Sequence, residues 1–263
     1  MRQALALIIL VLCCYGGVLL APDQEFVYDD SRFIAKNEAV KAPGNPLRFF
    51  ADPKTVDPGG WEGIYRPLRT LDFAIDWAIA GSDPVTVGTV RWFRLRNVLY
   101  HALSAVLLLF LLRRYGIPSP APFLAATVFA LHPVQVEAVA FITSRGDCLF
   151  MVFLLAALLC HTKAKGNDRW FNLAAVLLVL SVFSKEAAVV FPGLAVLGDF
   201  FFRDGRRPRR TLRRWQHYLS YLGISVAYVI VFLLTHSEYG GQVAHTDRWW
   251  GGTRFTTVLT MAR

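Results

Sequence analysis

The sequence predicts an all-α polytopic membrane protein, a helical bundle with one long loop after its first helix. Of its 263 residues 55% are hydrophobic, and the mean hydropathy is +0.41. The apolar residues form long blocks rather than an alternating pattern, which is typical of membrane-spanning helices. The Lys and Arg residues, which give a net charge of +9, crowd into short stretches between these blocks, as the positive-inside rule describes.

The first predicted helix covers residues 4–21. Arg2 and the apolar run after it have features of a cleaved signal peptide. The run also has about the length of a membrane span, and further apolar blocks follow, which favours a signal anchor that stays in the protein. The polar segment 22–96 is then expected to be the first extracytoplasmic loop.

The remaining apolar blocks predict six more spans. They cover 97–112, 120–132, 148–162, 170–183, 187–202 and 218–235, with a break at 184–186. As a helix the block 170–183 measures only about 21 Å, so one irregular span over 170–202 is an alternative. The final residues, TTVLTMAR, resemble the start of an eighth helix. We therefore expect one domain, 1–263, truncated from a longer protein.

The charges in the short loops predict the orientation. With the N-terminus inside, the short inner segments and Arg2 hold 13 Lys and Arg residues against two acids. A single span over 170–202 would move the arginine-rich run 203–215 outside, which this rule disfavours. We expect that run to lie beside anionic lipid, and no nucleic-acid partner. The four cysteines lie inside apolar blocks and are expected to be buried thiols.

This orientation brings charged and polar groups from distant parts of the chain to the outer side. They are Asp29 and Asp30, Arg66, the stretch 132–147 with His132, Glu137, Arg145 and Asp147, the pair Lys185 and Glu186, and the loop 236–252. Asn97 and His101 share one face at the start of the second predicted helix. Ionisable residues near the membrane surface usually pair and face a cavity, so we expect a shared site.

Acids and cations together indicate a class of chemistry. A carboxylate can act as general base toward a hydroxyl, or can hold a divalent metal ion. Arg and Lys can hold a phosphate leaving group. An enzyme with a lipid-phosphate-linked donor needs both, whereas a transporter favours charges at the bilayer midplane. Structural roles stay open: the acids at 29–30 are good caps for a helix starting at Ser31, and 185–186 could be a solvated tip.

Five stretches occur in an order that resembles one family. They are FVYDD (26–30) with Asn37, YRPL (65–68), NVLYH (97–101), HPVQVEAVAFITSRGD (132–147) and SKE (184–186). Together they resemble the transmembrane and tetratricopeptide-repeat O-mannosyltransferases and their bacterial relatives, multi-span glycosyltransferases of the GT-C class. The resemblance covers about 26–263, and the family's repeat array is not part of it.

The resemblance implies a GT-C-like bundle that moves a sugar, expected to be mannose, from a polyprenyl- or dolichyl-phosphate carrier to Ser or Thr hydroxyls of an acceptor protein. It implies that Asp29 or Asp30 is the catalytic base, on the extracytoplasmic face. By position, Arg66, Arg145 and Lys185 are the candidates for binding the donor phosphate. Supporting roles are expected for Asn97, His101, His132, Glu137, Asp147 and Glu186.

No cofactor is firmly implied, and a divalent metal ion stays open. A non-catalytic membrane scaffold and a transporter or polymerase of lipid-linked sugars are the alternatives. A scaffold predicts that the outer charged residues can be exchanged freely, and a transporter predicts carrier movement without a protein product. The sequence contains no N-x-[ST] sequon, which favours the bacterial inner membrane over the endoplasmic reticulum.

Overall fold

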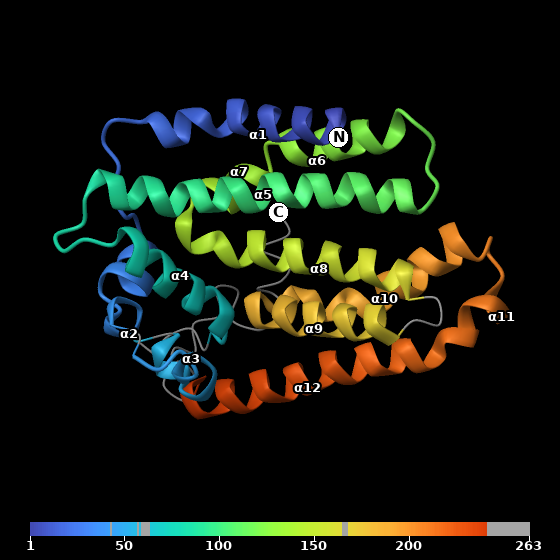
Figure 1. The fold of residues 1–263 in the computed structure, drawn as a ribbon. Helices are drawn as coiled ribbons and strands as arrows, with labels where there is room; N and C mark the ends of the chain where they lie inside the picture. Colours follow the sequence, from blue (N-terminus) through green and yellow to red (C-terminus); the bar gives the residue numbers. More distant parts are fainter. Residues whose placement is uncertain (43, 57, 59–63, 165–167, 241–263) are drawn as a thin grey trace, which may run out of the picture.

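The computed structural model describes residues 1–263 except 43, 57, 59–63, 165–167 and 241–263. The described residues form helices and turns and contain no strand. Their long helices lie side by side in one bundle (Figure 1). Several of them are long and apolar enough to cross a bilayer, so the predicted class, an all-α polytopic membrane protein, is confirmed.

The main helices of the bundle are α1 (Arg2–Leu20), α5 (Val87–Arg114), α6 (Ala121–Leu131), α8 (Arg145–Lys163), α9 (Asp168–Ser184), α10 (Phe191–Gly198) and α12 (Trp215–Gly240). The shorter elements are η1 (Ser31–Ala35), α2 (Glu38–Lys41), α3 (Arg48–Ala51), η2 (Pro53–Thr55), α4 (Pro67–Ala80), α7 (Gln135–Ala140), η3 (Ile142–Ser144), η4 (Glu186–Val190), η5 (Asp199–Arg203), α11 (Pro208–Thr211) and η6 (Leu212–Arg214).

Four described segments satisfy both length and hydropathy for a membrane span: Arg2–Leu20, Val87–Arg114, Ile142–Lys163 and Pro208–Thr235. Helices α6, α9 and α10 have 11, 17 and 8 residues. The total of seven spans therefore stays a prediction, and the expected eighth helix at TTVLTMAR lies outside the described residues.

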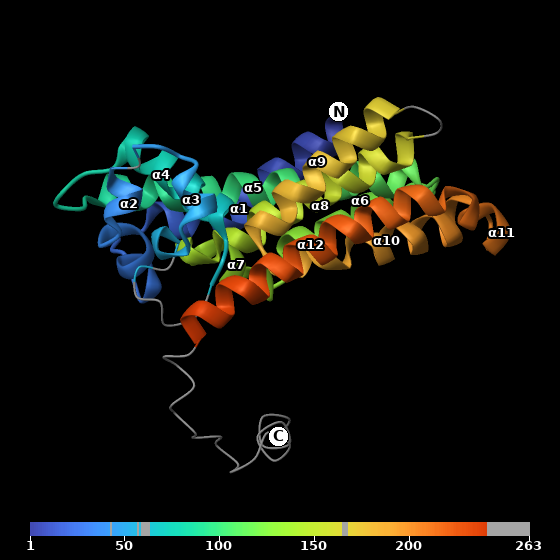
Figure 2. The same cartoon turned by 90° about the horizontal axis from the view of Figure 1, so that it is seen from below.

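The bundle has two distinct ends. Helices α2, α3 and α4 gather at one of them, and α11 lies at the other (Figures 1 and 2). We call the end with α2–α4 the outer end and the end with α11 the inner end, after the orientation predicted from the loop charges.

The chain reverses direction at Lys185. The carbonyl of Ser184 lies against the start of α8, whereas Asp199 contacts His161 near the end of α8, at 3.1 Å between Oδ2 and Nε2. Helix α9 and the segment from η4 to η5 are therefore two antiparallel passes beside α8. The alternative of a single irregular span over 170–202 is wrong.

The largest boundary error concerns α5, which begins at Val87 rather than at residue 97. Its first turns carry three arginines, which lower the hydropathy but are held by contacts. Arg91 Nη2 donates to the Ala21 carbonyl at 3.1 Å, and Arg94 Nη1 donates to Gln24 Oε1 at 2.9 Å. The loop predicted over 22–96 thus ends ten residues earlier. It also contains α4, an amphipathic helix that a hydropathy pattern does not reveal.

Small residues lie in the buried cluster shared by α8 and α9. Ala157 of α8 and Ala174 of α9 are fully buried, together with Leu178. Membrane helices associate mainly through close van der Waals packing, which small residues permit. On α12, Leu222 and Ile230 remain about half exposed, as suits a surface that faces acyl chains rather than water.

The cysteines divide between the interior and the surface of the bundle. All four are free thiols; Cys148 and Cys160 on α8 are buried, whereas Cys13 and Cys14 on α1 are exposed. The expectation of buried thiols is therefore wrong for the pair on α1, because that helix presents much of its apolar surface outward.

Candidate active site

A glycine lets α8 begin in close contact with the end of α9. A Cβ atom on Gly146 would lie 3.0 Å from the carbonyl oxygen of Ser184, 3.6 Å from Arg69 Cδ and 3.7 Å from Arg66 Cδ. Only a residue without a side chain allows this approach at no steric cost. The stretch around Gly146 therefore lies against the SKE segment and against Arg66 and Arg69 at the start of α4.

Arg66 and Glu186 form a bidentate ion pair across this junction. The Arg66 Nε and Nη2 atoms donate to Oε2 and Oε1 of Glu186 at 3.0 and 2.6 Å. The two side chains are 19% and 40% exposed. Partial burial acts to raise the pKa of Glu186, but the hydrogen bonds and charge of Arg66 outweigh it and hold that pKa below its usual range. The pair ties the long loop to the bundle.

A second ion pair lies next to the first in sequence. Lys185 Nζ donates to Asp147 Oδ1 at 2.5 Å, and the side chains are 24% and 33% exposed. Asp147 lies in the first turn of α8, where the helix dipole favours a negative charge. An ammonium group has three donors, so Lys185 can bind a further oxyanion while it keeps this contact.

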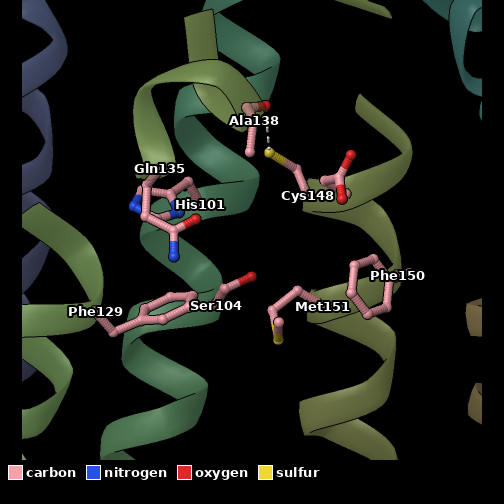
Figure 3. Close-up of a pocket in the computed structure, with 9 residues that line it drawn as sticks. His101, Ser104, Phe129, Gln135, Ala138, Cys148, Phe150 and Met151 are labelled. Carbon is pink, nitrogen blue, oxygen red and sulfur yellow. Dashed lines mark hydrogen bonds between the residues drawn. The ribbon is translucent and has the colours of Figure 1, made fainter. Parts of the chain in front are cut away.

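A pocket of about 130 Å³ opens beside Asp147, between α5 and α8. Its lining residues are His101, Ser104, Phe129, Gln135, Ala138, Asp147, Cys148, Phe150 and Met151. Figure 3 shows His101 and Ser104 on the wall formed by α5, with Ser104 pointing toward Met151 on α8. Apolar walls with a few convergent polar groups are typical of small-molecule sites. His101 is fixed there, because its Nε2 lies 2.9 Å from the Ala130 carbonyl oxygen.

Arg145 is completely buried and has protein partners on every nitrogen. Nε donates to Asn97 Oδ1 at 2.8 Å and Nη2 donates to the Phe93 carbonyl at 2.7 Å. Nη1 contacts Asp72, at 2.8 Å, and Asp76. In this arrangement the guanidinium holds α4, α5 and α8 together, and its complete burial keeps it from a bound phosphate.

The buried acids around Arg145 have a second cation. Arg96 contacts Asp72 at 2.9 Å and Asp76 at 3.1 Å, so two acids face two arginines. Such balance is needed because an unpaired buried charge is costly. Our sequence reasoning missed Asp72 and Asp76. Their signal was two acids four residues apart in the otherwise apolar stretch LDFAIDWAI, which places both on one face of a helix.

The two acids after α1 have different surroundings. Asp30 is fully buried, and its carboxylate accepts hydrogen bonds from the backbone N–H of Thr143 at 3.0 Å and of Val27 at 3.3 Å. Burial raises the pKa of Asp30. Its side chain makes no capping bond to η1, so the proposed cap at Ser31 is wrong for this acid. Asp30 instead fastens the segment after α1 to η3.

Asp29 is exposed. The residue before it, Tyr28, has a φ of +48°, a left-handed conformation that costs a non-glycine residue roughly 1 kcal/mol or more. The ring of Tyr28 lies 6.4 Å from that of Phe141, between centroids. The sharp turn therefore lies against the α7–η3 connection and leaves Asp29 accessible while Asp30 is enclosed.

The remaining candidates lie around α7. His132 and Glu137 are exposed, and the His132 ring accepts a hydrogen bond from Val134 N–H at 3.2 Å. Most of the loop 236–252 lies outside the described residues.

Within the described ranges, no group of three or more His, Cys, Asp and Glu side chains is placed to hold a metal ion. The binding of a divalent metal ion therefore stays a hypothesis.

Comparison with known proteins gives one consistent result. The mouse protein O-mannosyl-transferase TMTC3 is 27% identical over 215 residues, which cover 78% of this chain and 22% of the relative. The protein O-mannosyl-transferase F38B6.6 of Caenorhabditis elegans is 31% identical and covers 73% of this chain and 26% of the relative. The protein O-mannosyl-transferase Tmtc1 of Drosophila melanogaster is 34% identical, over a region that covers 69% of this chain and 21% of the relative.

No protein-family model and no solved structure matches the chain. The chain spans about a fifth to a quarter of the length of the curated relatives it matches. Through the region that it shares with them, the chain belongs to the TMTC family of protein O-mannosyl-transferases.

Proposed function

We propose that this chain is the membrane-embedded part of a glycosyltransferase that moves mannose from a polyprenyl- or dolichyl-phosphate carrier to Ser or Thr hydroxyls of an acceptor protein. The reaction would take place at the outer, extracytoplasmic end. The relatives' names support a mannosyl transfer. The observation that carries the proposal is the Lys185–Asp147 pair at the edge of a pocket with apolar walls.

Lys185 and Arg66 are the proposed ligands of the carrier phosphate. Both are partly exposed, and both are held in place by a carboxylate, Asp147 and Glu186 respectively. A phosphate diester would share these cations with the carboxylates through charge-assisted hydrogen bonds. Arg145 is the third phosphate ligand that the sequence predicts. Its enclosure supports a positioning role instead, in which it holds α8 so that Asp147 reaches Lys185.

Asp29 is the proposed general base. Its side chain is accessible, whereas the carboxylate of Asp30 already accepts two backbone hydrogen bonds. Asp29 would take the proton of the acceptor hydroxyl as that oxygen bonds to the sugar C1. The bond from C1 to the phosphate oxygen breaks, and the carrier phosphate keeps the electron pair while the cations stabilise its charge.

The pocket beside Asp147 suits the part of the donor next to the phosphate. Phe129, Phe150 and Met151 offer apolar and aromatic contacts, while Ser104 and Gln135 offer hydrogen bonds. We propose that this pocket accepts the sugar or the first isoprene unit. His101 would then act as a fixed wall, and Asn97 would act through Arg145.

The test uses the full-length protein in proteoliposomes with an acceptor rich in Ser and Thr. Tritiated mannose is supplied either on a polyprenyl-phosphate carrier or on GDP. We expect label on the acceptor from the lipid-linked donor alone. Label from GDP-mannose alone would refute the donor assignment. Movement of the carrier across the bilayer without labelled protein would favour a transporter, and no label from any donor would favour a scaffold.

A further inference from the structure

The inner end of the bundle holds a second pocket, remote from the candidate active site. Its volume is about 220 Å³, and it is lined by Arg114, Tyr115, Thr162, Phe202 and Arg203. Helix α8 runs from Arg145 at the outer end to Thr162 beside this pocket, a distance of about 25 Å along a helix. The pocket therefore lies on a different surface, at the end marked by α11 in Figure 1.

Arg203 presents two hydrogen-bond donors that have no protein acceptor. Its side chain is only 10% exposed, and Nη1 donates to Asp199 Oδ1 at 3.1 Å. The Nε and Nη2 atoms are buried and have no hydrogen-bond partner in the described part of the protein. A buried donor without a partner is costly, so this edge of the guanidinium needs an acceptor.

The same edge of another arginine shows what it can bind. Arg66 uses its Nε and Nη2 atoms to hold both carboxylate oxygens of Glu186. The free edge of Arg203 has the same fork geometry, which matches two oxygens of a carboxylate or a phosphate. Arg114 adds a second positive charge to the lining, and no acid is among the residues that line this pocket. The pocket is therefore built for an anion.

We propose that this pocket binds a phosphate oxyanion, with Arg203 as the bidentate donor and Arg114 as the second cation. A phospholipid headgroup is the favoured source. Phe202 in the pocket lining and Phe201, its neighbour in sequence, are each about half exposed. The pocket also lies at the end of the apolar helix α5, where headgroups would lie. A soluble phosphate offers the same chemistry, so the experiment must separate the two sources.

The experiment measures binding to the purified full-length protein in neutral detergent, by native mass spectrometry and by thermal protection. The probes are phosphatidylglycerol, diacylglycerol, which lacks a phosphate, and inorganic phosphate. The variants are Arg203→Lys, which keeps the charge but loses the fork, and Arg114→Gln. The matched control is Arg209→Gln, which changes an exposed arginine of the same inner end.

We expect both pocket variants to weaken phosphatidylglycerol binding about tenfold or more, the effect of losing charge-assisted hydrogen bonds. Arg209→Gln should weaken it far less, because an exposed arginine adds only a screened attraction to anionic lipid. Protection by inorganic phosphate alone, sensitive to the same variants, would support the site with a soluble source. Equal binding of diacylglycerol, or an equal loss in Arg209→Gln, would overturn the proposal. Arg114 is exposed, so its variant decides if Arg203→Lys does not fold.

Discussion

Replacing Arg145 by methionine is predicted to destabilise the outer end of the bundle. The side chain is completely buried and faces two carboxylates, those of Asp72, 12% exposed, and Asp76, fully buried. Removal of one partner from a buried ion pair leaves an uncompensated charge and typically costs about 3–5 kcal/mol. Arg96 remains beside both acids, so one carboxylate would still be paired, and we expect the lower part of this range.

The assay is the apparent unfolding temperature of the purified protein in detergent, followed by the loss of its folded size-exclusion peak on heating. At about 2–4 °C per kcal/mol for a domain of this size, a loss of about 3–4 kcal/mol lowers the unfolding temperature by roughly 6–16 °C. Arg91→Met is the matched control. Its guanidinium is exposed and donates to one carbonyl, so its effect should be below about 1 kcal/mol.

A double variant separates charge balance from packing. In Arg145→Met/Asp76→Leu the two remaining charged groups of this cluster, Asp72 and Arg96, form a one-to-one pair at 2.9 Å. Replacing both members of a buried pair by apolar residues is often nearly neutral, so the double variant should recover most of the lost stability. The reasoning would be refuted if Arg145→Met unfolded at the wild-type temperature, or if the double variant were less stable than the single one.

Three further predictions follow from the junction between α8 and α9. Gly146→Ala should lower the apparent unfolding temperature by a few degrees, because its Cβ would press on the Ser184 carbonyl at 3.0 Å. An unchanged temperature would contradict the close packing. Lys185→Gln should raise the KM for the lipid-linked donor about tenfold, because one charge-assisted hydrogen bond to the phosphate is lost. Lys36→Gln, which changes an exposed lysine, should leave this KM unchanged. Equal KM values for wild type and Lys185→Gln would contradict the role of Lys185 as a phosphate ligand. The Arg66 pair lowers the pKa of Glu186 from its usual value of 4.5, so the stabilisation from this pair is full above that value and is lost as the pH falls through the lowered one. The difference in unfolding temperature between wild type and Glu186→Gln should therefore stay constant from about pH 7 to 5 and shrink from about pH 4.5 to 3.

The sequence was sufficient for features that depend on local patterns. Helix α6 ends within a residue of the predicted bounds, because Pro120 and Pro133 flank it and proline disfavours helix continuation. The reversal at Lys185 was visible as three polar residues inside a long apolar block. Both signals act over a few neighbouring residues.

The features that were missed depend on contacts between distant parts of the chain. The start of α5 at Val87 is held by arginine contacts to residues about 70 positions earlier. Arg145 was interpreted as a phosphate ligand, because a cation between apolar blocks has the same pattern whether it faces a ligand or buried acids. Its partners Asp72 and Asp76 lie about 70 positions away, and no local pattern pairs them with it.

The most direct test of the proposed transfer compares Asp29→Asn with wild type in the proteoliposome assay, using polyprenyl-phosphate mannose. Asp23→Asn, an exposed acid in the same segment, is the matched control. A general base typically contributes about 100-fold or more to the rate, so Asp29→Asn should lower kcat by at least that factor and leave membrane insertion intact, while the control keeps wild-type transfer. A wild-type kcat in Asp29→Asn would contradict the account.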